Sequence, residues 1–290
     1  MRTKINKKHP LEKEVIGLLK DLLPLHSIYV ISVNTEKRKQ DVYLPPSNAT
    51  TQKVVTYTLL IICHKFPSKG LAGFMDDICN KMQQRCKVYA IMYTLSKVKK
   101  RLDYGDNFLN QIINKTPCLY KENKVLIEFK NCRNFTHESV YLEIEEIWRN
   151  RMNRAEYLLS ILDSIEHKED TISRLSTMHY ALEQICLGLL YVFWEFKPQH
   201  YSLPYMLHLC NHFTQLPQTI FPNETYGLHR IKYMLCNAHH IIRFKAQNEF
   251  SDRDADKAYN RCELFYEEAK SLGDKRMEYL KELHCETVES

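Results

Sequence analysis

The 290-residue sequence contains few of the residues that break regular structure, with 7 glycines and 10 prolines, and no segment of biased composition. This composition is typical of a folded globular chain rather than a disordered one. The longest nearly apolar run, residues 187–194, falls far short of the ~20 residues that a membrane helix needs, so no membrane span is expected. The basic N-terminal stretch leads into no apolar segment, and we therefore predict no secretory signal.

The ten cysteines are scattered, and no two of them form a C-x-x-C pair. This usage is typical of free thiols in a reducing compartment, so a cytoplasmic location is predicted. Residues 1–136 carry 24 Lys and Arg against 11 Asp and Glu, whereas the remainder carries 17 against 24. The two parts therefore have net charges of +13 and −7. A basic half can indicate a nucleic-acid surface, or two parts or subunits that dock by complementary charge.

Residues 1–130 are predicted to form an α/β domain. Strands are expected at 27–33, 53–63 and 87–94, with short edge strands at 118–120 and 124–129 and a loop at 34–52. Helices are expected at 10–23, 71–86, 96–102 and 107–114. The all-apolar end of the second strand, residues 59–63, is typical of a central strand covered on both faces. Residues 131–138 are polar and aperiodic, and are predicted to be a linker.

Residues 139–290 are predicted to form an all-helical bundle, which makes the chain a two-domain α+β protein. A helix beginning near Thr171 is apolar on nearly all sides and should be buried on more than one face. Pro198 is expected to end it, and a short helix should begin near residues 202–204. Other helices are expected over 139–167, over 226–245, and from Asp252 to about residue 283, with a cap at Ser251 and a possible break at Gly273.

The helical part carries a resemblance to a known family. His179-Tyr180-Ala181-Leu182-Glu183, followed by Phe196-Lys197-Pro198-Gln199-His200 and Leu203, resembles the HEPN family, in which an LHQAAE-like helix leads through a G-x-K-P-x-x-H turn into a short helix. The glycine of that turn is not kept. The resemblance implies a homodimer formed through the helical domain. The back of the long helix, with Leu190, Phe193 and Trp194, would supply an exposed apolar surface for it.

The N-terminal part is similar to the minimal nucleotidyltransferase domain, through the strand pair 28–32 and 56–62 and through Gly105-Asp106-Asn107-Phe108-Leu109 running to Cys118-Leu119-Tyr120. Active members have Gly-Ser after the first strand and an Asp-x-Asp pair on the second that holds Mg²⁺. Here those places read Ser32-Val33 and Thr56-Tyr57-Thr58. Because nucleotidyl transfer needs metal-binding carboxylates, we predict a degenerate domain without this activity. Asp41, Asp76 and Asp77 are interpreted as solvated surface residues.

Many HEPN domains are metal-independent ribonucleases with an R-x(4–6)-H motif, in which the Arg stabilises phosphate charge and the His moves a proton. The matching place begins at Arg243, and no His follows four to six residues later. The sequence is closer to the A-R-Y-K type, which is associated with nucleotide binding. The predicted nucleotide- or phosphate-binding residues are Arg243, Lys245, Phe244, His239 and His179. No catalytic residue, metal or cofactor is assigned, since His208 and His212 make only half of a zinc site.

Each of these residues also has a structural interpretation. Arg243 can be tied to Glu183 as a buried pair that joins two helices, and His239 and His179 can be core residues. Three functions follow from the sequence. The first is a non-catalytic protein that binds a nucleotide or RNA. The second is a HEPN ribonuclease of a toxin-antitoxin-like system, using Arg243 and one of His239, His240 and His179. The third is an interaction module without a ligand.

Overall fold

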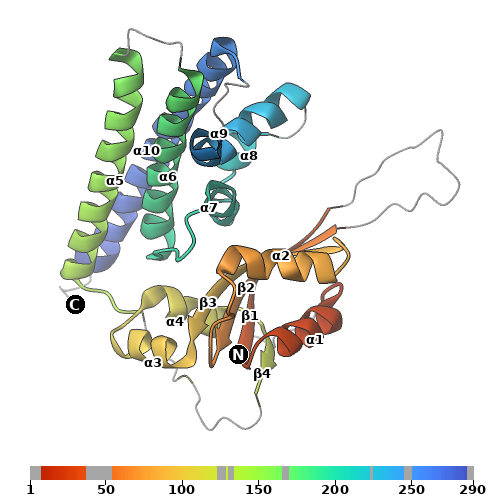
Figure 1. Cartoon of the computed structure of the whole chain (residues 1–290). Coiled ribbons are helices and arrows are strands. Elements are labelled where there is room, and N and C mark those ends of the chain that lie inside the picture. Colours follow the sequence, from red (N-terminus) through yellow and green to blue (C-terminus); the bar gives the residue numbers. More distant parts are fainter. Residues whose placement is uncertain are drawn as a thin grey trace, which may run out of the picture. The chain divides into compact units, whose positions relative to one another are not determined.

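The computed structural model describes residues 8–36, 54–122, 129, 134–164, 170–222, 225–244 and 250–285. The chain divides into two compact units, Met1–Phe135 and Thr136–Ser290, shown in Figure 1. The first unit contains a four-stranded mixed sheet and the second a set of helices. The chain thus has a two-part α+β layout, and the division falls inside the stretch 131–138.

The sheet of the first unit has the strand order β3-β2-β1-β4. Its strands are β1 (Leu25–Glu36), β2 (Val54–Cys63), β3 (Cys86–Thr94) and β4 (Cys118–Lys121). β2 runs parallel to β3, and β1 is antiparallel to both β2 and β4. Residues 59–63 of β2 are fully buried, which confirms the prediction of a covered central strand. Most of the second predicted edge strand, residues 124–128, lies outside the described residues.

Four helices accompany this sheet: α1 (Glu12–Leu22), α2 (Leu71–Lys81), α3 (Leu95–Asp103) and α4 (Asn107–Lys115). Alternate residues of β2, including Tyr57 and Leu59, share one core with Val15 of α1 and Phe74 of α2, as the period of two in a strand requires. α2 ends five residues before its predicted end. Gln83 and Gln84 adopt φ values of 51° and 58°, so the chain turns there before entering β3.

Part of the predicted linker is bound to α4. The side chain of Asn107 donates to the Phe135 carbonyl at 2.9 Å and accepts from the Phe135 N–H at 2.7 Å. Asn110 donates to the Asn134 side chain at 3.0 Å. Gly105, at φ 79°, lies against the Phe135 ring, where an added Cβ would come within 3.2 Å. The paired amide hydrogen bonds explain why the polar stretch is ordered at 134–135 instead of forming a free linker.

The second unit is entirely helical within the described residues. Its helices are α5 (Glu138–Ser164), α6 (Thr171–Trp194), α7 (Leu203–Cys210), α8 (Leu216–Ile220), α9 (Tyr226–Phe244) and α10 (Asp252–Cys285). α6 packs against α5, α7, α9 and α10, and 18 of its 24 residues are buried, which confirms the predicted burial on several faces. The short α8 was not predicted from the sequence. None of the helices in these described ranges is long and apolar enough to cross a membrane.

α6 ends three residues before its expected end. Glu195 takes a left-handed conformation, with φ 53°, and Phe196 then donates its N–H to the Leu190 carbonyl at 3.3 Å. The helix is therefore terminated by a backbone turn at Glu195 and not by Pro198. The predicted apolar back of α6 is only partly exposed. Leu190 is fully buried, whereas Phe193 and Trp194 are half-buried, and the Phe193 ring stacks on the Phe213 ring at 4.5 Å.

α10 is one continuous helix of 34 residues and has no break at Gly273. An added Cβ at Gly273 would lie 2.2 Å from the indole of Trp148 in α5, and one at Gly188 of α6 would lie 3.0 Å from the same ring. The glycine is therefore required by the close passage of Trp148 and does not interrupt the helix. The indole N–H of Trp148 donates to Asp274 at 2.8 Å.

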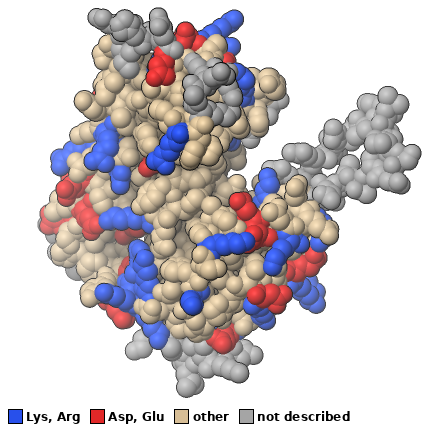
Figure 2. Space-filling view, viewed as in Figure 1, with Lys and Arg blue, Asp and Glu red and all other residues tan. Residues whose placement is uncertain are grey.

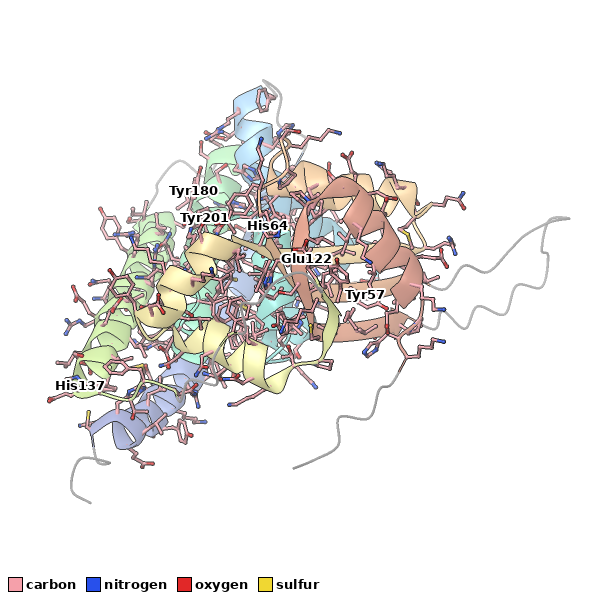
Figure 3. All side chains as sticks on the ribbon, turned by 90° about the horizontal axis from the view of Figure 1, so that it is seen from below. Tyr57, His64, Glu122, His137, Tyr180 and Tyr201 are labelled. Carbon is pink, nitrogen blue, oxygen red and sulfur yellow. The ribbon has the colours of Figure 1, made fainter. Side chains whose placement is uncertain are left out.

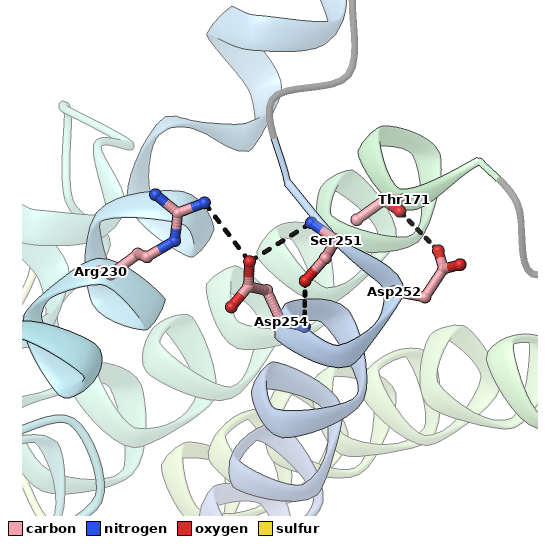
Figure 4. A network of polar contacts seen from close by, with 5 residues as sticks. All are labelled: Thr171, Arg230, Ser251, Asp252 and Asp254. Atoms are coloured by element: carbon pink, nitrogen blue, oxygen red, sulfur yellow. Dashed lines mark hydrogen bonds and ion pairs between the residues drawn. The ribbon is translucent and has the colours of Figure 1, made fainter.

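The two ends of α10 are fixed by polar contacts. At its start, Ser251 Oγ accepts the Asp254 N–H at 3.2 Å, as predicted for the cap (Figure 4). The Asp254 carboxylate accepts from Arg230 of α9 at 3.3 Å, and Asp252 accepts from Thr171 of α6 at 2.8 Å. At the other end, His284 Nδ1 accepts the His137 backbone N–H at 3.2 Å, so the first and last helices of the unit are joined.

Candidate functional site on helix α9

The positions that the nucleotidyltransferase resemblance assigns to the Gly-Ser and Asp-x-Asp motifs contain hydroxyl groups. Ser32 of β1 lies beside Thr58 of β2, and its Oγ donates to Thr58 Oγ1 at 3.1 Å. Tyr57 is fully buried and its hydroxyl donates to the Pro10 carbonyl. In the described part of the chain, no three His, Cys, Asp or Glu side chains lie close enough to hold a metal ion. These side chains cannot bind Mg²⁺ as a carboxylate pair would.

Other acidic residues of this unit are surface groups, as predicted. Asp76 is exposed, and Asp77 forms an ion pair with Lys69 at 2.7 Å. Asp41 lies outside the described residues. His64 and Glu122 come together where β2 and β4 end, with Nε2 and Oε2 2.9 Å apart (Figure 3).

Much of the positive charge of the N-terminal part lies outside the described residues. Of the 24 Lys and Arg in residues 1–136, 10 fall in undescribed stretches, together with only 2 of the 11 acidic residues. On the face shown in Figure 2, basic and acidic side chains of this unit are interspersed. The described sheet unit therefore offers less support for a nucleic-acid surface than the sequence total suggested.

Helix α9 presents a row of aromatic, imidazole and amide side chains away from the core. Its buried face consists of Ile231, Met234, Leu235, Cys236, Ala238 and Ile241. The row on the other side follows spacings of three and four residues, as one face of a helix does. It comprises Tyr226, His229, Tyr233, Asn237, His240 and Phe244, and we call it the α9 row.

The aromatic members of the α9 row are open to solvent. Tyr226 is 82% exposed, Tyr233 50% and Phe244 71%. The His240 and Phe244 rings lie 4.6 Å apart. At 1.5 Å per residue, the 19 residues of α9 extend for about 28 Å. Flat rings exposed along such a length are the kind of surface on which successive nucleic-acid bases stack.

The predicted site residues are only partly brought together. Arg243 and Phe244 are exposed at the end of α9, and Lys245 lies outside the described residues. His239 is half-buried, with its ring centroid 4.6 Å from that of His179, which is only 2% exposed. His179 therefore does not line an open groove with Arg243, because it belongs to the core between α6 and α9.

Hydrogen bonding fixes the protonation of this histidine pair. His179 Nδ1 lies 2.8 Å from the Leu235 carbonyl, which can only accept, so Nδ1 carries the proton. Burial lowers the pKa of His179, and it also lowers the pKa of His239, which the charge of Arg243 lowers further. Both shifts favour the neutral imidazole, although His179 Nε2 also lies 4.0 Å from Glu183 Oε2. The pair serves packing, as the structural interpretation of the sequence proposed.

The alternative of an Arg243–Glu183 pair is wrong. Arg243 is exposed, and the guanidinium that interacts electrostatically with Glu183 is that of Arg151 in α5. Arg151 donates to Gln184 of α6 at 2.6 Å. Sequence reasoning missed Arg151 because nothing in the α5 sequence identifies which residues face α6. The α9 row could have been found, since its spacing of three and four residues is visible in the sequence.

A comparison of the chain with protein-family models finds no match, and a comparison with curated proteins finds none either. The function of the α9 row is therefore argued from its geometry and chemistry.

Proposed function

We propose that the helical unit binds single-stranded RNA along the α9 row, as a non-catalytic module of the HEPN type that follows a degenerate nucleotidyltransferase-like domain. The observation that carries the proposal is the α9 row, in which every residue is exposed except Asn237, which is half-buried and donates to the Tyr233 carbonyl at 2.8 Å. Tyrosine, histidine and phenylalanine rings stack on bases of any identity, and Asn237 can hydrogen-bond a base edge.

The charge of α9 suits a polyanion. None of its 19 residues is acidic. Arg243 lies beside Phe244 at the exposed end, and Lys232 is half-buried on the flank of the row. Arg230 is already engaged with Asp254 and with the Phe250 ring, 5.2 Å from its guanidinium carbon. Phosphate contacts from Arg243 and Lys232 would make the affinity fall with salt, with a log–log slope of about −0.7 per neutralised phosphate of a single strand.

Replacing Tyr233 or Phe244 with alanine is expected to weaken RNA binding. Stacking of one base on an aromatic side chain contributes about 1–3 kcal/mol by alanine substitution. Each variant should therefore raise the Kd about 5- to 150-fold, at 1.4 kcal/mol for each factor of ten. The measurement is fluorescence anisotropy of a labelled ten-nucleotide RNA titrated with the intact chain, in EDTA and at several salt concentrations.

Tyr157→Ala is the matched control, since Tyr157 is a tyrosine of the same unit that is 66% exposed on α5. Its Kd should equal that of the wild type. Equal affinity of Tyr233→Ala, Phe244→Ala and Tyr157→Ala would rule out the α9 row as the RNA surface. If the chain is a dimer, and if Tyr233→Ala dissociates it while RNA affinity stays unchanged, the α9 row would be a self-association surface instead. If the wild type cleaves the RNA in EDTA and His240→Ala does not, the function would be ribonuclease activity and not binding alone.

A further inference from the structure

A second site on the helical unit is formed by α5, α6 and the turn that follows α6. These elements surround a cavity of about 400 Å³, within the size range of small-molecule sites. Its polar lining consists of Asn150, Arg151, Arg154, Tyr191, Lys197 and Tyr201. All of the lining residues belong to one unit, and none belongs to the α9 row.

The cavity concentrates positive charge. Arg151 and Arg154 lie three residues apart on α5, where side chains project to the same face. Burial lowers the pKa of Arg151, and the charge of Arg154 lowers it further, so the two guanidinium groups repel each other. Among the described residues, no carboxylate lies within 4.0 Å of either guanidinium group. An anion bound between them would remove this repulsion.

Arg151 has a neutral and an acidic neighbour on α6. Its Nη1 donates to the neutral amide of Gln184 at 2.6 Å. Burial raises the pKa of the nearby Glu183 carboxyl and the charge of Arg151 lowers it, so Glu183 offsets part of the Arg151 charge. A phosphate can accept two parallel N–H bonds from one guanidinium, which makes it a suitable partner for the pair of arginines.

The opposite side of the cavity is held in place by Glu143. This carboxylate accepts from the Tyr191 hydroxyl at 2.8 Å and from Lys197 Nζ at 3.3 Å. Lys197 Nζ also lies 4.8 Å from the centre of the Tyr191 ring. The lysine thus lies at the cavity as a third cation, in an exposed ion pair with Glu143. The turn that carries it begins at the left-handed residue Glu195.

An aromatic side chain completes the site. Tyr201 is 54% exposed, is labelled in Figure 3, and belongs to the cavity lining together with Leu187, Phe196 and Pro198. Phe196 is only 1% exposed and forms an apolar floor. A planar base therefore has an apolar surface and an aromatic ring to contact in this cavity, which the arginines also line.

We propose that this cavity binds a nucleoside monophosphate, with Arg151, Arg154 and Lys197 holding the phosphate and Tyr201 contacting the base. The two arginines come from helix α5 of the bundle, and Lys197 and Tyr201 come from the turn between α6 and α7. The proposal is independent of RNA binding by α9, since the two sites share no residue.

The test is calorimetric titration of the intact chain, without Mg²⁺, with AMP, GMP, adenosine and inorganic phosphate. AMP or GMP should bind saturably, phosphate more weakly, and adenosine most weakly. Arg154→Gln should lower nucleotide affinity about tenfold or more, since a charge-assisted hydrogen bond is lost. Arg154 is exposed, so this variant should fold, and an unchanged Tm would verify it.

Arg149→Gln is the charge-matched control, because Arg149 is exposed on α5 and lines a different cavity, next to α10. Phe244→Ala separates the two sites, since it should weaken RNA binding and leave AMP affinity unchanged. No saturable heat with either nucleotide would overturn the proposal. The same would follow if Arg154→Gln and Arg149→Gln bound AMP equally well. If inorganic phosphate bound as tightly as AMP, the base would contribute nothing to binding and the site would be a phosphate site.

Discussion

Gly273→Ala is expected to destabilise the helical unit by about 1–3 kcal/mol or more, although alanine is the better helix former by about 1 kcal/mol. The reason is the 2.2 Å separation between an added Cβ and the rigid indole of Trp148. That ring has little room to move away, because Gly188 lies against it as well: a Cβ added at Gly188 would be 3.0 Å from the ring. The variant must therefore push α5 and α10 apart, and it should lose packing along both helices.

The measurement is urea unfolding followed by tryptophan fluorescence. The chain has two tryptophans, Trp148 and Trp194, and both lie in the helical unit, so the signal reports that unit alone. Gly227→Ala in α9 is the matched control, because nothing lies within 4 Å of an added Cβ there, and its stability should be unchanged or slightly higher. Wild-type stability of Gly273→Ala would contradict the packing argument.

A double-mutant cycle sharpens this result. Trp148→Phe alone should cost stability, because it opens a cavity and removes the hydrogen bond to Asp274. In the Gly273→Ala background the smaller ring should cost less, since it makes room for the new methyl group. Additive losses would show that Gly273 and Trp148 act separately.

Acid is expected to destabilise the helical unit, with His208 of α7 as a large contributor. Burial, together with the charge of the neighbouring His212, lowers the pKa of His208 to about 3; the two ring centroids lie 5.3 Å apart. The unfolded chain binds a proton near pH 6.5, whereas the folded unit resists it. Stability is therefore fully present above pH 6.5 and decreases as the pH falls towards 3. At 1.36 kcal/mol per pKa unit, the loss is on the order of 5 kcal/mol.

The check is the urea midpoint of tryptophan fluorescence at pH 7 and pH 4. His208→Leu should reduce the difference between the two midpoints, because it removes a group that takes up a proton more readily in the unfolded chain than in the folded one. Part of the difference should remain, since burial also lowers the pKa of His179 and His212. His229→Gln, at an exposed position of α9, should leave the difference unchanged. A wild-type pH response in His208→Leu would contradict this assignment.

Helices and strands were predictable from the sequence where the run of apolar residues indicates that the element is buried. The apolar end of β2 and the all-round apolar α6 are examples, because a residue covered on every side must be apolar wherever the partners come from. The cap at Ser251 was also predictable, since capping depends on neighbours only three residues away. The five-residue α8 is too short to show a period, and it was missed for that reason.

Tertiary contacts decided the features that sequence reasoning got wrong. Gly273 looks like a helix break until Trp148, more than a hundred residues away, is found against it. Leu190 looks available for a partner subunit, yet it is fully buried within the unit. The partner of Glu183 proved to be Arg151 and not Arg243, because several basic residues could reach it and only the packing of α5 on α6 selects one. The candidate site survives in part, through Arg243 and Phe244.

The contact between His137 and His284 joins residues 147 positions apart in sequence and places both ends of the helical unit together. A unit whose ends meet can be inserted into a surface turn of another protein at little loop-closure cost. The same closure makes folding depend on the last helix, because α10 covers α5, α6, α8 and α9 only after the whole unit has been synthesised. Many native contacts of the helical unit therefore join residues that are far apart in the sequence. The unit should fold more slowly than its helical content alone suggests.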